Sequence, residues 1–245
     1  MAVIRVGVTG TDTGVGKTTV SRALVGLLRA DGLRVAAMKP VETGVTRDDP
    51  ASDAHALAAA AGGADAMRDV CPVVLDDPLA PWMAARRAGR TLDMSALDTS
   101  FERLSAGADA ILVEGAGGLL VPITLTDTYL SLFQRWSLDA IVVAANRLGA
   151  INHTMLTVQA LRNGGVSILG IVLNETDGAE RDLARRTNHE TLQALLPDTP
   201  VVSFPWLPAM ADHTSLTTAA AAAGLRAVLA HATPYHHSHS GHLDR

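Results

Sequence analysis

The sequence has a single cysteine, Cys71, and few aromatic residues, and both scarcities exclude classes of protein. One cysteine cannot form an internal disulfide, and this usage is typical of proteins in a reducing compartment such as the cytoplasm. An aromatic content of 3% argues against a stacking surface for single-stranded nucleic acid. The apolar runs are too short to cross a bilayer, and the first of them does not resemble a signal peptide. We therefore expect a cytoplasmic protein.

A surplus of positive charge is also absent. The formal net charge is −5 and the pI is about 5.9, so we expect neither nucleic acid nor an anionic membrane as a partner. No linker or repeat is evident, and we expect one domain over residues 1–232. A loose, histidine-containing tail should follow over 233–245. A metal site is the alternative for these histidines, but they lack an ordered ligand spacing.

The most informative stretch is Gly-Thr-Asp-Thr-Gly-Val-Gly-Lys-Thr-Thr over residues 10–19. It follows a short β-branched run over 3–9, which is typical of a buried strand. Apolar residues at helical spacing follow it over 20–30. A strand, a glycine-rich turn and Gly-Lys-Thr before a helix together predict a phosphate-binding loop.

The residue types in this loop suit the binding of a polyphosphate. Backbone N–H groups close on phosphate oxygens only where side chains are absent, so we expect that role for Gly14 and Gly16. Lys17 should reach the outer phosphates, and the Thr18 hydroxyl should ligate Mg²⁺. In the usual spacing the first glycine would stand at residue 11, but here it is Gly10. An ordinary glycine-rich turn with an exposed lysine is the alternative interpretation.

Apolar strands and helical patterns alternate along the rest of the chain. They predict an α/β fold with a doubly wound, mostly parallel sheet and helices on both faces, as in P-loop NTPases. The expected strands cover 3–9, 33–38, 109–114, 140–145, 166–173 and 201–204. The expected helices cover 20–30, 48–63, 82–88, 95–106, 128–136, 150–163, 179–196 and 216–230, with an irregular stretch over 68–81.

Unusual polar residues follow the carboxyl ends of the expected strands, where ligands bind in such a sheet. Glu114 is expected to hold Mg²⁺ opposite Thr18, with an ordinary loop carboxylate as the alternative. Asp53 is either a second carboxylate near Mg²⁺ or a simple partner of a helix dipole. Lys39 is expected to be a fixed cation facing the phosphates rather than an exposed lysine. Asn174 offers the donor and acceptor that adenine recognition needs, but a turn asparagine is an equal alternative.

Six segments together resemble the dethiobiotin synthetase family. They are residues 10–18, Lys-Pro-Val-Glu-Thr-Gly over 39–44, Ser-Asp-Ala over 52–54, Val-Glu-Gly-Ala-Gly-Gly over 113–118, Gly-Ala-Ile-Asn-His over 149–153 and Pro-Trp-Leu over 205–207. They occur in the family's order, and the shifted glycine of the phosphate loop is the family's own version. The segments over 39–41 and 113–118 are the more specific part of the resemblance.

This resemblance implies an ATP- and Mg²⁺-dependent ring closure in biotin biosynthesis. Family members form a carbamate from CO₂ on one amine of 7,8-diaminononanoate (7,8-diaminopelargonate) and phosphorylate it from ATP. The second amine then attacks the carbamic-phosphoric anhydride, and dethiobiotin, ADP and phosphate are released. The protein would thus be a ligase that forms carbon–nitrogen bonds, working as a homodimer with its active sites at the interface.

The resemblance also implies roles for the matching residues. Lys17 and Lys39 would be catalytic by stabilising carbamate and phosphoryl charge, and Thr18, Asp53 and Glu114 would hold Mg²⁺. The nucleotide would be bound by Gly14, Val15, Gly16, Lys17, Thr18, Thr19, Asp53, Glu114, Gly115, Ala116, Gly117, Asn174, Pro205, Trp206 and Leu207. The substrate would be contacted by Thr13, Lys39, Thr43, Gly118, Ala150, Ile151 and Asn152.

Two positions depart from the family pattern. Trp82 stands where many relatives carry histidine, and Asn188 is the candidate to replace a substrate contact from the helix after Asn174. Two rival classes remain as alternatives. A partition or cell-division ATPase switch would place a lysine early in the phosphate loop, where this sequence has Asp12. A cobyrinic acid-type amidotransferase synthetase would need a further domain with a nucleophilic cysteine, for which the chain has no room.

Overall fold

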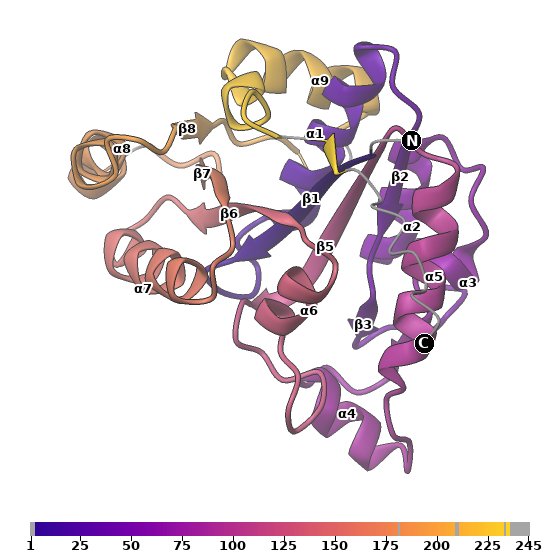
Figure 1. The fold of residues 1–245 in the computed structure, drawn as a ribbon. Helices are drawn as coiled ribbons and strands as arrows, with labels where there is room; N and C mark the ends of the chain where they lie inside the picture. Colours follow the sequence, from indigo (N-terminus) through magenta and orange to yellow (C-terminus); the bar gives the residue numbers. More distant parts are fainter. Residues whose placement is uncertain (1–2, 181, 209–210, 233, 236–245) are drawn as a thin grey trace, which may run out of the picture.

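The computed structural model describes residues 3–180, 182–208, 211–232 and 234–235, which form a mostly parallel sheet with helices on both faces (Figure 1). The doubly wound α/β prediction is confirmed. The strands are β1 (Val3–Gly10), β2 (Val35–Met38), β3 (Val41–Thr43), β4 (Val73–Leu75), β5 (Ala110–Gly118), β6 (Asp139–Ala145), β7 (Ile168–Asn174), β8 (Val201–Phe204) and β9 (Pro234–Tyr235). The helices are α1 (Lys17–Ala30), α2 (Asp53–Ala61), α3 (Met67–Val70), α4 (Pro81–Arg87), α5 (Met94–Ala106), α6 (Tyr129–Arg135), α7 (Ala150–Asn163), α8 (Leu183–Leu195), α9 (His213–Ala222) and the 3₁₀ helix η1 (Leu225–Val228).

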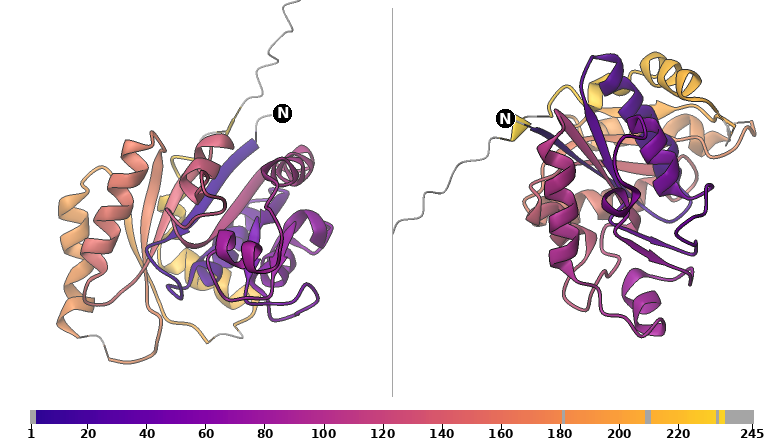
Figure 2. Two further views of the ribbon diagram at one scale, coloured as in Figure 1. Left: turned by 90° about the horizontal axis from the view of Figure 1, so that it is seen from below. Right: turned by 90° about the vertical axis from the view of Figure 1, so that its right-hand side faces the viewer.

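The main sheet has the strand order β2-β5-β1-β6-β7-β8, and neighbouring strands in this path are parallel. Successive residues of β6 alternate between two apolar clusters: Ala140, Val142 and Ala144 face one, and Ile141 and Val143 face the other. The two views in Figure 2 show the sheet between its layers of helices. The strands are therefore nearly continuous apolar runs because both faces of the sheet are buried.

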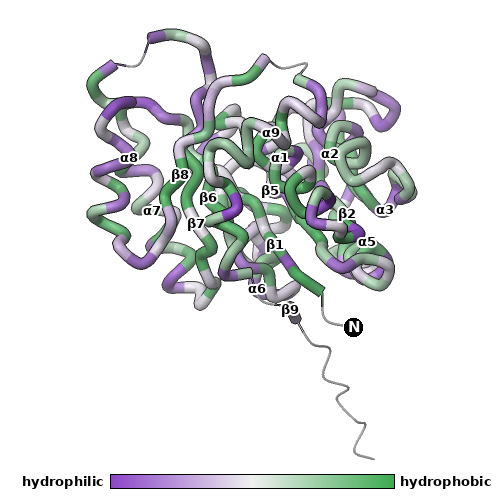
Figure 3. The backbone as a smooth tube through the Cα atoms, turned by 90° about the horizontal axis from the view of Figure 1, so that it is seen from above, coloured by the Kyte–Doolittle hydropathy of each residue, from purple (hydrophilic) through white to green (hydrophobic). Residues whose placement is uncertain are grey.

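Figure 3 shows the hydropathy of each residue along the backbone: the strands are predominantly apolar, and the outer helices are mixed. Residues of α1 and α9 belong to the apolar cluster on one face, residues of α5, α6 and α7 belong to the cluster on the other, and α2 contributes to both. In β1, Gly7 makes room for a helix, because a Cβ at this position would lie 2.5 Å from the Phe133 ring of α6. The central strand thus packs closely under its covering helices.

Helix ends differ from the predicted ones where a capping residue or a glycine decides them. Helix α8 begins at Leu183 rather than at residue 179, because the Asp182 carboxylate accepts the Arg185 N–H at 2.8 Å as an N-cap. The helix expected over 216–230 is divided into α9 and η1, and Gly224 between them has a φ of 79°. Within the described part of the chain, no helix is long and apolar enough to cross a bilayer.

A second, two-stranded sheet was not predicted: β4 lies within the stretch expected to be irregular, and β3 follows the strand expected over 33–38. Strands β3 and β4 pair in parallel, with Glu42 opposite Val74, and Val41 belongs to the main apolar core. Each strand has only three residues, which is too short for a recognisable alternation. This small sheet continues directly from the segment that follows β2 and forms one side of the candidate site.

The predicted tail over 233–245 falls mostly outside the described residues. The exception is Pro234–Tyr235, which forms β9 and pairs antiparallel with Val3 and Ile4 of β1. The guanidinium of Arg5 lies 3.9 Å from the centroid of the Tyr235 ring. At these two residues the structure therefore differs from the expected loose tail.

Candidate active site

The phosphate loop connects the end of β1 at Gly10 to the start of α1 at Lys17. Gly14 and Gly16 have φ values of 73° and 87°, in the left-handed region that favours glycine. The shifted first glycine has a steric cause, because a Cβ at Gly10 would lie 2.7 Å from the Asp12 carbonyl oxygen and 2.9 Å from Lys17 Nζ. The loop folds back over the end of β1, and glycine is required at residue 10 for that reason.

Asn174, at the end of β7, supports the phosphate loop from the neighbouring part of the sheet. Its Nδ2 donates to the Val15 carbonyl oxygen at 3.0 Å, and the residue is 4% exposed. Because a carbonyl oxygen can only accept, this contact fixes which way the amide points. A Cβ at Gly16 would lie 2.0 Å from the same Nδ2. Gly16 is thus required both for its φ and for the close approach of Asn174.

We expect Gly16→Ala to weaken ADP binding by about 100-fold, since left-handed strain costs about 1–2 kcal/mol and the clash adds about 1–3 kcal/mol. Gly14→Ala is the matched control, because Gly14 has a similar φ but no atom within 4 Å of its would-be Cβ. That variant should lose only about tenfold, from strain alone. Isothermal titration calorimetry measures both, and equal losses would show that the contact with Asn174 is unimportant.

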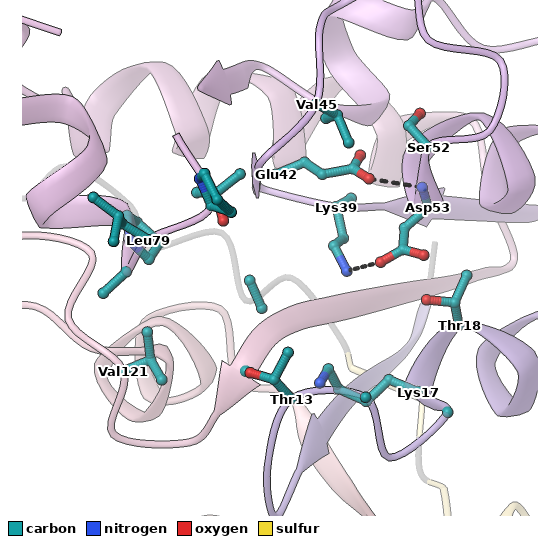
Figure 4. A pocket seen from close by; sticks show the side chains of 18 of the residues that line it. Thr13, Lys17, Thr18, Lys39, Glu42, Val45, Ser52, Asp53, Leu79 and Val121 are labelled. Atoms are coloured by element: carbon teal, nitrogen blue, oxygen red, sulfur yellow. Dashed lines mark hydrogen bonds and ion pairs between the residues drawn. The ribbon is translucent and has the colours of Figure 1, made fainter. Parts of the chain in front are cut away.

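Lys39 directly follows β2 and lies between two carboxylates. Its Nζ is 2.5 Å from Glu114 Oε1 and 2.8 Å from Asp53 Oδ2, and Figure 4 shows the second contact. The Thr18 hydroxyl donates to the same Glu114 oxygen at 2.9 Å. Lys39 is 3% exposed and Glu114 is fully buried. Residues from α1, α2, β5 and the end of β2 therefore meet at one point, as the rule for strand ends predicts.

The two lysines of the site differ in their electrostatic environment. Burial alone would lower the pKa of Lys39, but Glu114 and Asp53 raise it above its ordinary value, so this ammonium stays charged. Burial, together with the Lys39 cation, lowers the pKa of Lys17 to about 8. Burial would raise the pKa of Asp53, but Lys39 outweighs it and holds that pKa below its usual range. Lys39 is thus a permanent cation, whereas Lys17 makes no ion pair with a carboxylate of the described residues and is suited to an incoming anion.

The oxygen donors of Thr18, Asp53 and Glu114 fit a hard cation such as Mg²⁺. Glu114 Oε2 is buried and has no hydrogen-bond partner among the described residues, which leaves a carboxylate lone pair for a ligand. The described residues contain no group of three His, Cys, Asp or Glu that could hold a metal alone. A Mg²⁺ ion that takes its remaining ligands from phosphate and water suits such a set.

A cavity of about 830 Å³ opens beside the phosphate loop, within the size range of small-molecule sites (Figure 4). One side is polar and includes Lys17, Lys39 and Asp53. The side that carries Leu79 and Val121 is apolar and also includes Pro78, Ala80 and Pro81, whereas Val45 lies beside Glu42 and Ser52. The arrangement can hold a polyphosphate at one end and a molecule with a hydrocarbon portion at the other.

Half of the residues predicted for nucleotide and substrate border this cavity. Those lining it are Thr13, Gly14, Gly16, Lys17, Thr18, Thr19, Lys39, Thr43, Asp53, Ala116 and Gly117. Glu114 does not line the cavity itself, but it contacts Lys39, which does. Val15 is buried. In the glycine-rich end of β5, Gly115 lies against the Tyr129 ring, and Gly118 pairs with Gly10 of β1.

The residues predicted for adenine lie together at the edge formed by β7 and β8. Asn174 pairs with Phe204, so Pro205 to Leu207 continue directly from the neighbouring strand. Trp206 is 46% exposed, and its ring lies beside Gly178, where a Cβ would be 3.3 Å away. These residues do not line the main cavity.

Ala150, Ile151 and Asn152 form the first turn of α7, and they do not line the cavity of their own chain. Asn188 is 3% exposed, and its Nδ2 donates to Asn146 Oδ1 at 2.9 Å and to the Arg147 carbonyl oxygen at 3.1 Å. Its amide therefore joins α8 to the loop before α7. Trp82, the other departure, donates its backbone N–H to the Pro122 carbonyl oxygen and also does not line the cavity.

Several residues of the cavity were not predicted from the sequence. They are Glu42, Val45, Ala51, Ser52, Val121 and the segment 78–81. A signal was available for Glu42, which lies inside the Lys-Pro-Val-Glu-Thr-Gly segment. A second signal was composition: Lys17 and Lys39 are the only lysines in the whole sequence, and both belong to the site.

Comparisons with known proteins identify relatives of this chain. A family model described as an AAA domain matches residues 5–214. ATP-dependent dethiobiotin synthetase BioD of Anaeromyxobacter dehalogenans (strain 2CP-C) is 44% identical over 204 residues, which cover 83% of this chain and 91% of that protein. The protein of the same name from Aquifex aeolicus is 38% identical over 192 residues, which cover 78% of this chain and 84% of that protein.

Solved structures are similar at the level of the fold. The cell division ATPase MinD of Pyrococcus furiosus has a TM-score of 0.52 and 21% identity, with 89% of this chain and 97% of that chain covered. A plasmid partition protein of Borrelia burgdorferi bound to AMPPNP has a TM-score of 0.52 and 12% identity, with 92% and 99% covered. These identities are too low to carry function across.

The sheet order, the phosphate loop and the lysine held between two carboxylates define a P-loop nucleotide-binding protein of the doubly wound α/β class. Two dethiobiotin synthetases are 44% and 38% identical to this chain over most of its length and of their own. The chain therefore belongs to the ATP-dependent dethiobiotin synthetase family. Members of that family are ATP-dependent ligases that form carbon–nitrogen bonds. The alternative of a partition or cell-division ATPase is not favoured, because that similarity stays at the level of the fold.

Proposed function

We propose that this protein closes the ureido ring of dethiobiotin in biotin biosynthesis, consuming ATP, CO₂ and 7,8-diaminononanoate and releasing ADP and phosphate. The observation that carries the proposal is the Lys39 ammonium, held 2.5 Å from Glu114 and 2.8 Å from Asp53 beside the phosphate loop of a chain in this family. A fixed cation is needed where a phosphoryl group is transferred to a carbamate oxygen, because negative charge gathers there.

The proposed reaction asks this chain for positioning and charge stabilisation. One substrate amine attacks CO₂ and loses a proton to give a carbamate, and a carbamate oxygen then takes the γ-phosphoryl group of ATP. The second amine attacks the carbonyl carbon of this mixed anhydride, and the ring closes as phosphate leaves. No protein nucleophile takes part, and burial raises the pKa of the Cys71 thiol to about 12, which keeps it unreactive.

At the nucleotide end, backbone N–H groups of residues 14–19 would wrap the phosphates, with Lys17 on the outer ones. Thr18, Asp53 and Glu114 would hold Mg²⁺, which supplies positive charge to phosphate oxygens when bound. The unpartnered Oε2 of Glu114 supports that assignment. Lys39 would stabilise charge on the carbamate and on the transferred group.

The adenine base is proposed to lie beside Asn174 and Pro205 to Leu207. The adjacent ends of β7 and β8 support this position, since they bring these residues together next to the phosphate loop. The reaction is assigned to the cytoplasm as the compartment that supplies ATP. We propose small molecules, rather than nucleic acid or a membrane, as the partners of this site.

The diamine end of the substrate would contact Thr13, Thr43 and Gly118. We propose that its carboxylate binds at Ala150 to Asn152 of a second copy of the chain, in a homodimer. These residues begin a helix, where a carboxylate is bound favourably, and they do not line the cavity of their own chain. The neighbouring Leu148 and Leu156 are 84% and 62% exposed, which supports a contact between copies there.

The test is ADP release and product formation in a complete mixture of ATP, Mg²⁺, bicarbonate and 7,8-diaminononanoate, with each component omitted in turn. We expect ADP only in the complete mixture, together with an equal amount of dethiobiotin identified by mass spectrometry. ADP formation that does not require the diamine would contradict the proposal and favour an ATPase switch instead.

A further inference from the structure

Glu42 is a buried carboxylate at the edge of the cavity that the proposed reaction does not use. It lies in β3, close to Lys39 in the chain, and is 5% exposed. Both of its oxygens contact the N-terminus of α2: Oε1 accepts the Asp53 N–H at 2.7 Å and Oε2 accepts the Ala54 N–H at 3.0 Å. Figure 4 shows the first of these contacts beside that of Asp53 with Lys39. A charged group that accepts two adjacent N–H groups holds a helix end firmly.

The first turn of α2 is fully paired in this way. Glu42 takes the N–H groups of Asp53 and Ala54, and the Ser52 hydroxyl takes that of His55 at 3.3 Å. The Ser52 carbonyl oxygen takes the N–H of Ala56 at 3.1 Å. Ser52 belongs to the chain segment that enters the helix, whereas Glu42 reaches it from β3. Glu42 is therefore the cap that ties α2 to the segment carrying Lys39.

The contact of Glu42 with the N-terminus of α2 matters for Asp53 because of where Asp53 lies in the fold. Lys39 and Glu114 are on strands of the main sheet or directly after them, and Thr18 is in the first turn of α1. Asp53 instead lies on α2, which is reached through the largely exposed segment 44–52. Leu57 and Ala60 pack α2 into the apolar core, and the 2.8 Å contact between Asp53 and Lys39 depends on where this packing and the contacts of its N-terminus place the first residue of the helix.

We propose that Glu42 is a positioning residue: by clamping the N-terminus of α2 to the segment that carries Lys39, it holds the Asp53 carboxylate in place against the Lys39 ammonium. Glu42 acts through Asp53, and both of its oxygens are already engaged by backbone N–H groups. This inference rests on the proposed function, in which Asp53 helps to hold Mg²⁺ and Lys39 faces the transferred group.

The first test is Glu42→Gln, which keeps the shape of the side chain but leaves one acceptor oxygen and turns an NH₂ group toward a backbone N–H. We expect kcat and the affinity for Mg·ADP each to fall about tenfold or more, as for other residues that orient metal ligands. Affinity for ADP in the presence of a chelator should stay within about twofold, since the phosphate loop is untouched.

Asp93→Asn is the matched control. Asp93 caps α5 by accepting the Ser95 N–H at 2.9 Å, and it does not line the cavity. This variant should lower Tm somewhat, as loss of a cap does, without changing kcat or Mg·ADP affinity. If Glu42→Gln likewise changed Tm alone, Glu42 would be an ordinary helix cap and the proposal would be overturned.

A second readout is independent of turnover. Because Lys17 and Lys39 are the only lysines, ¹³Cε-lysine labelling gives two side-chain signals, and Lys17→Arg assigns them. Glu42→Gln should shift the Lys39 signal, because the Asp53 carboxylate moves relative to it, whereas Asp93→Asn should leave both signals in place. An unchanged Lys39 signal in folded Glu42→Gln would contradict the proposal.

A double-mutant cycle with Asp53→Asn asks whether Glu42 acts through Asp53. In the Asp53→Asn background, Glu42→Gln should lower kcat by less than about twofold, because the effects of substituting two interacting residues are not additive. A full additive loss would overturn the proposal. If Glu42→Gln does not fold, Glu42→Asp takes its place. This variant keeps the charge but shortens the side chain, and we expect an intermediate kcat.

These outcomes separate the two proposals. Wild-type protein that makes no dethiobiotin would contradict the proposed function, whatever Glu42 does. An active wild type in which Glu42→Gln behaves like Asp93→Asn would contradict only the role of Glu42.

Discussion

Replacing Lys39 by glutamine is expected to lower kcat for dethiobiotin formation by about 10²–10³-fold, the range for removal of a preorganised group that stabilises developing charge. The Lys39 ammonium is 3% exposed, so water cannot substitute for it. The affinity for Mg·ADP should not fall, because removal of Lys39 frees Glu114 Oε1 and Asp53 Oδ2 for the ion. Steady-state kinetics and calorimetry measure the two quantities separately.

The same substitution should lower the free energy of unfolding by about 3–5 kcal/mol, because it leaves a buried carboxylate without its cation. Arg34→Gln is a control at the other end of the segment containing β2. It removes the cation of an exposed pair, Arg34 with Asp109, and should leave both turnover and stability near the wild type. Normal activity in Lys39→Gln would show that Lys39 has only a structural role.

Replacing Glu114 by alanine is expected to weaken Mg·ADP binding by about 10–100-fold, the usual loss when a metal-site residue is removed. ADP measured in the presence of a chelator should bind nearly as it does to the wild type, because Glu114 contacts the Thr18 hydroxyl of the phosphate loop, whereas backbone N–H groups would bind the phosphates. The physical reason is that Glu114 supplies a buried oxygen beside the Thr18 hydroxyl, 2.9 Å away, and that its second oxygen accepts no hydrogen bond from the described residues.

Glu102→Ala is the corresponding control, since Glu102 is exposed on α5 and does not line the cavity. It should change neither affinity. Equal weakening of ADP with and without Mg²⁺ in Glu114→Ala would remove Glu114 from the ligands of the ion. Its effect would then be an indirect one through Lys39.

For the centre of the site, the sequence was enough to predict which side chains lie close together. Lys17, Lys39 and Glu114 follow or end apolar runs that are far apart in the sequence, and the carboxyl ends of parallel strands lie at the same edge of a sheet. The structure brings these residues together as expected. Their proposed roles toward ATP, Mg²⁺ and substrate stay predictions.

Other parts of the site had no comparable signal. Strands β3 and β4 have three residues each, so neither shows an alternation that could place Glu42 against α2. The apolar wall from Pro78 to Pro81 comes from a stretch that the sequence predicted only as irregular. Such segments take their conformation from the elements they pack against rather than from their own pattern.

Asn174 illustrates the same limit in a single residue. From the sequence, a turn asparagine and an adenine ligand were equal alternatives. The structure adds a contact that neither interpretation contained, the bond from Nδ2 to the Val15 carbonyl oxygen at 3.0 Å. These residues are far apart in the chain, and only the pairing order of β1, β6 and β7 brings them together.

Local patterns in the sequence were enough to establish the class of fold, the phosphate loop and the family resemblance, because these depend on apolar runs, glycine positions and short motifs. That Lys39 lies between Asp53 and Glu114, and that Glu42 contacts the helix on which Asp53 stands, follows from the tertiary structure alone. These contacts join β5, α2, β3 and the segment after β2. Distances between such elements are set by how they pack, and no pattern within any one of them contains that information.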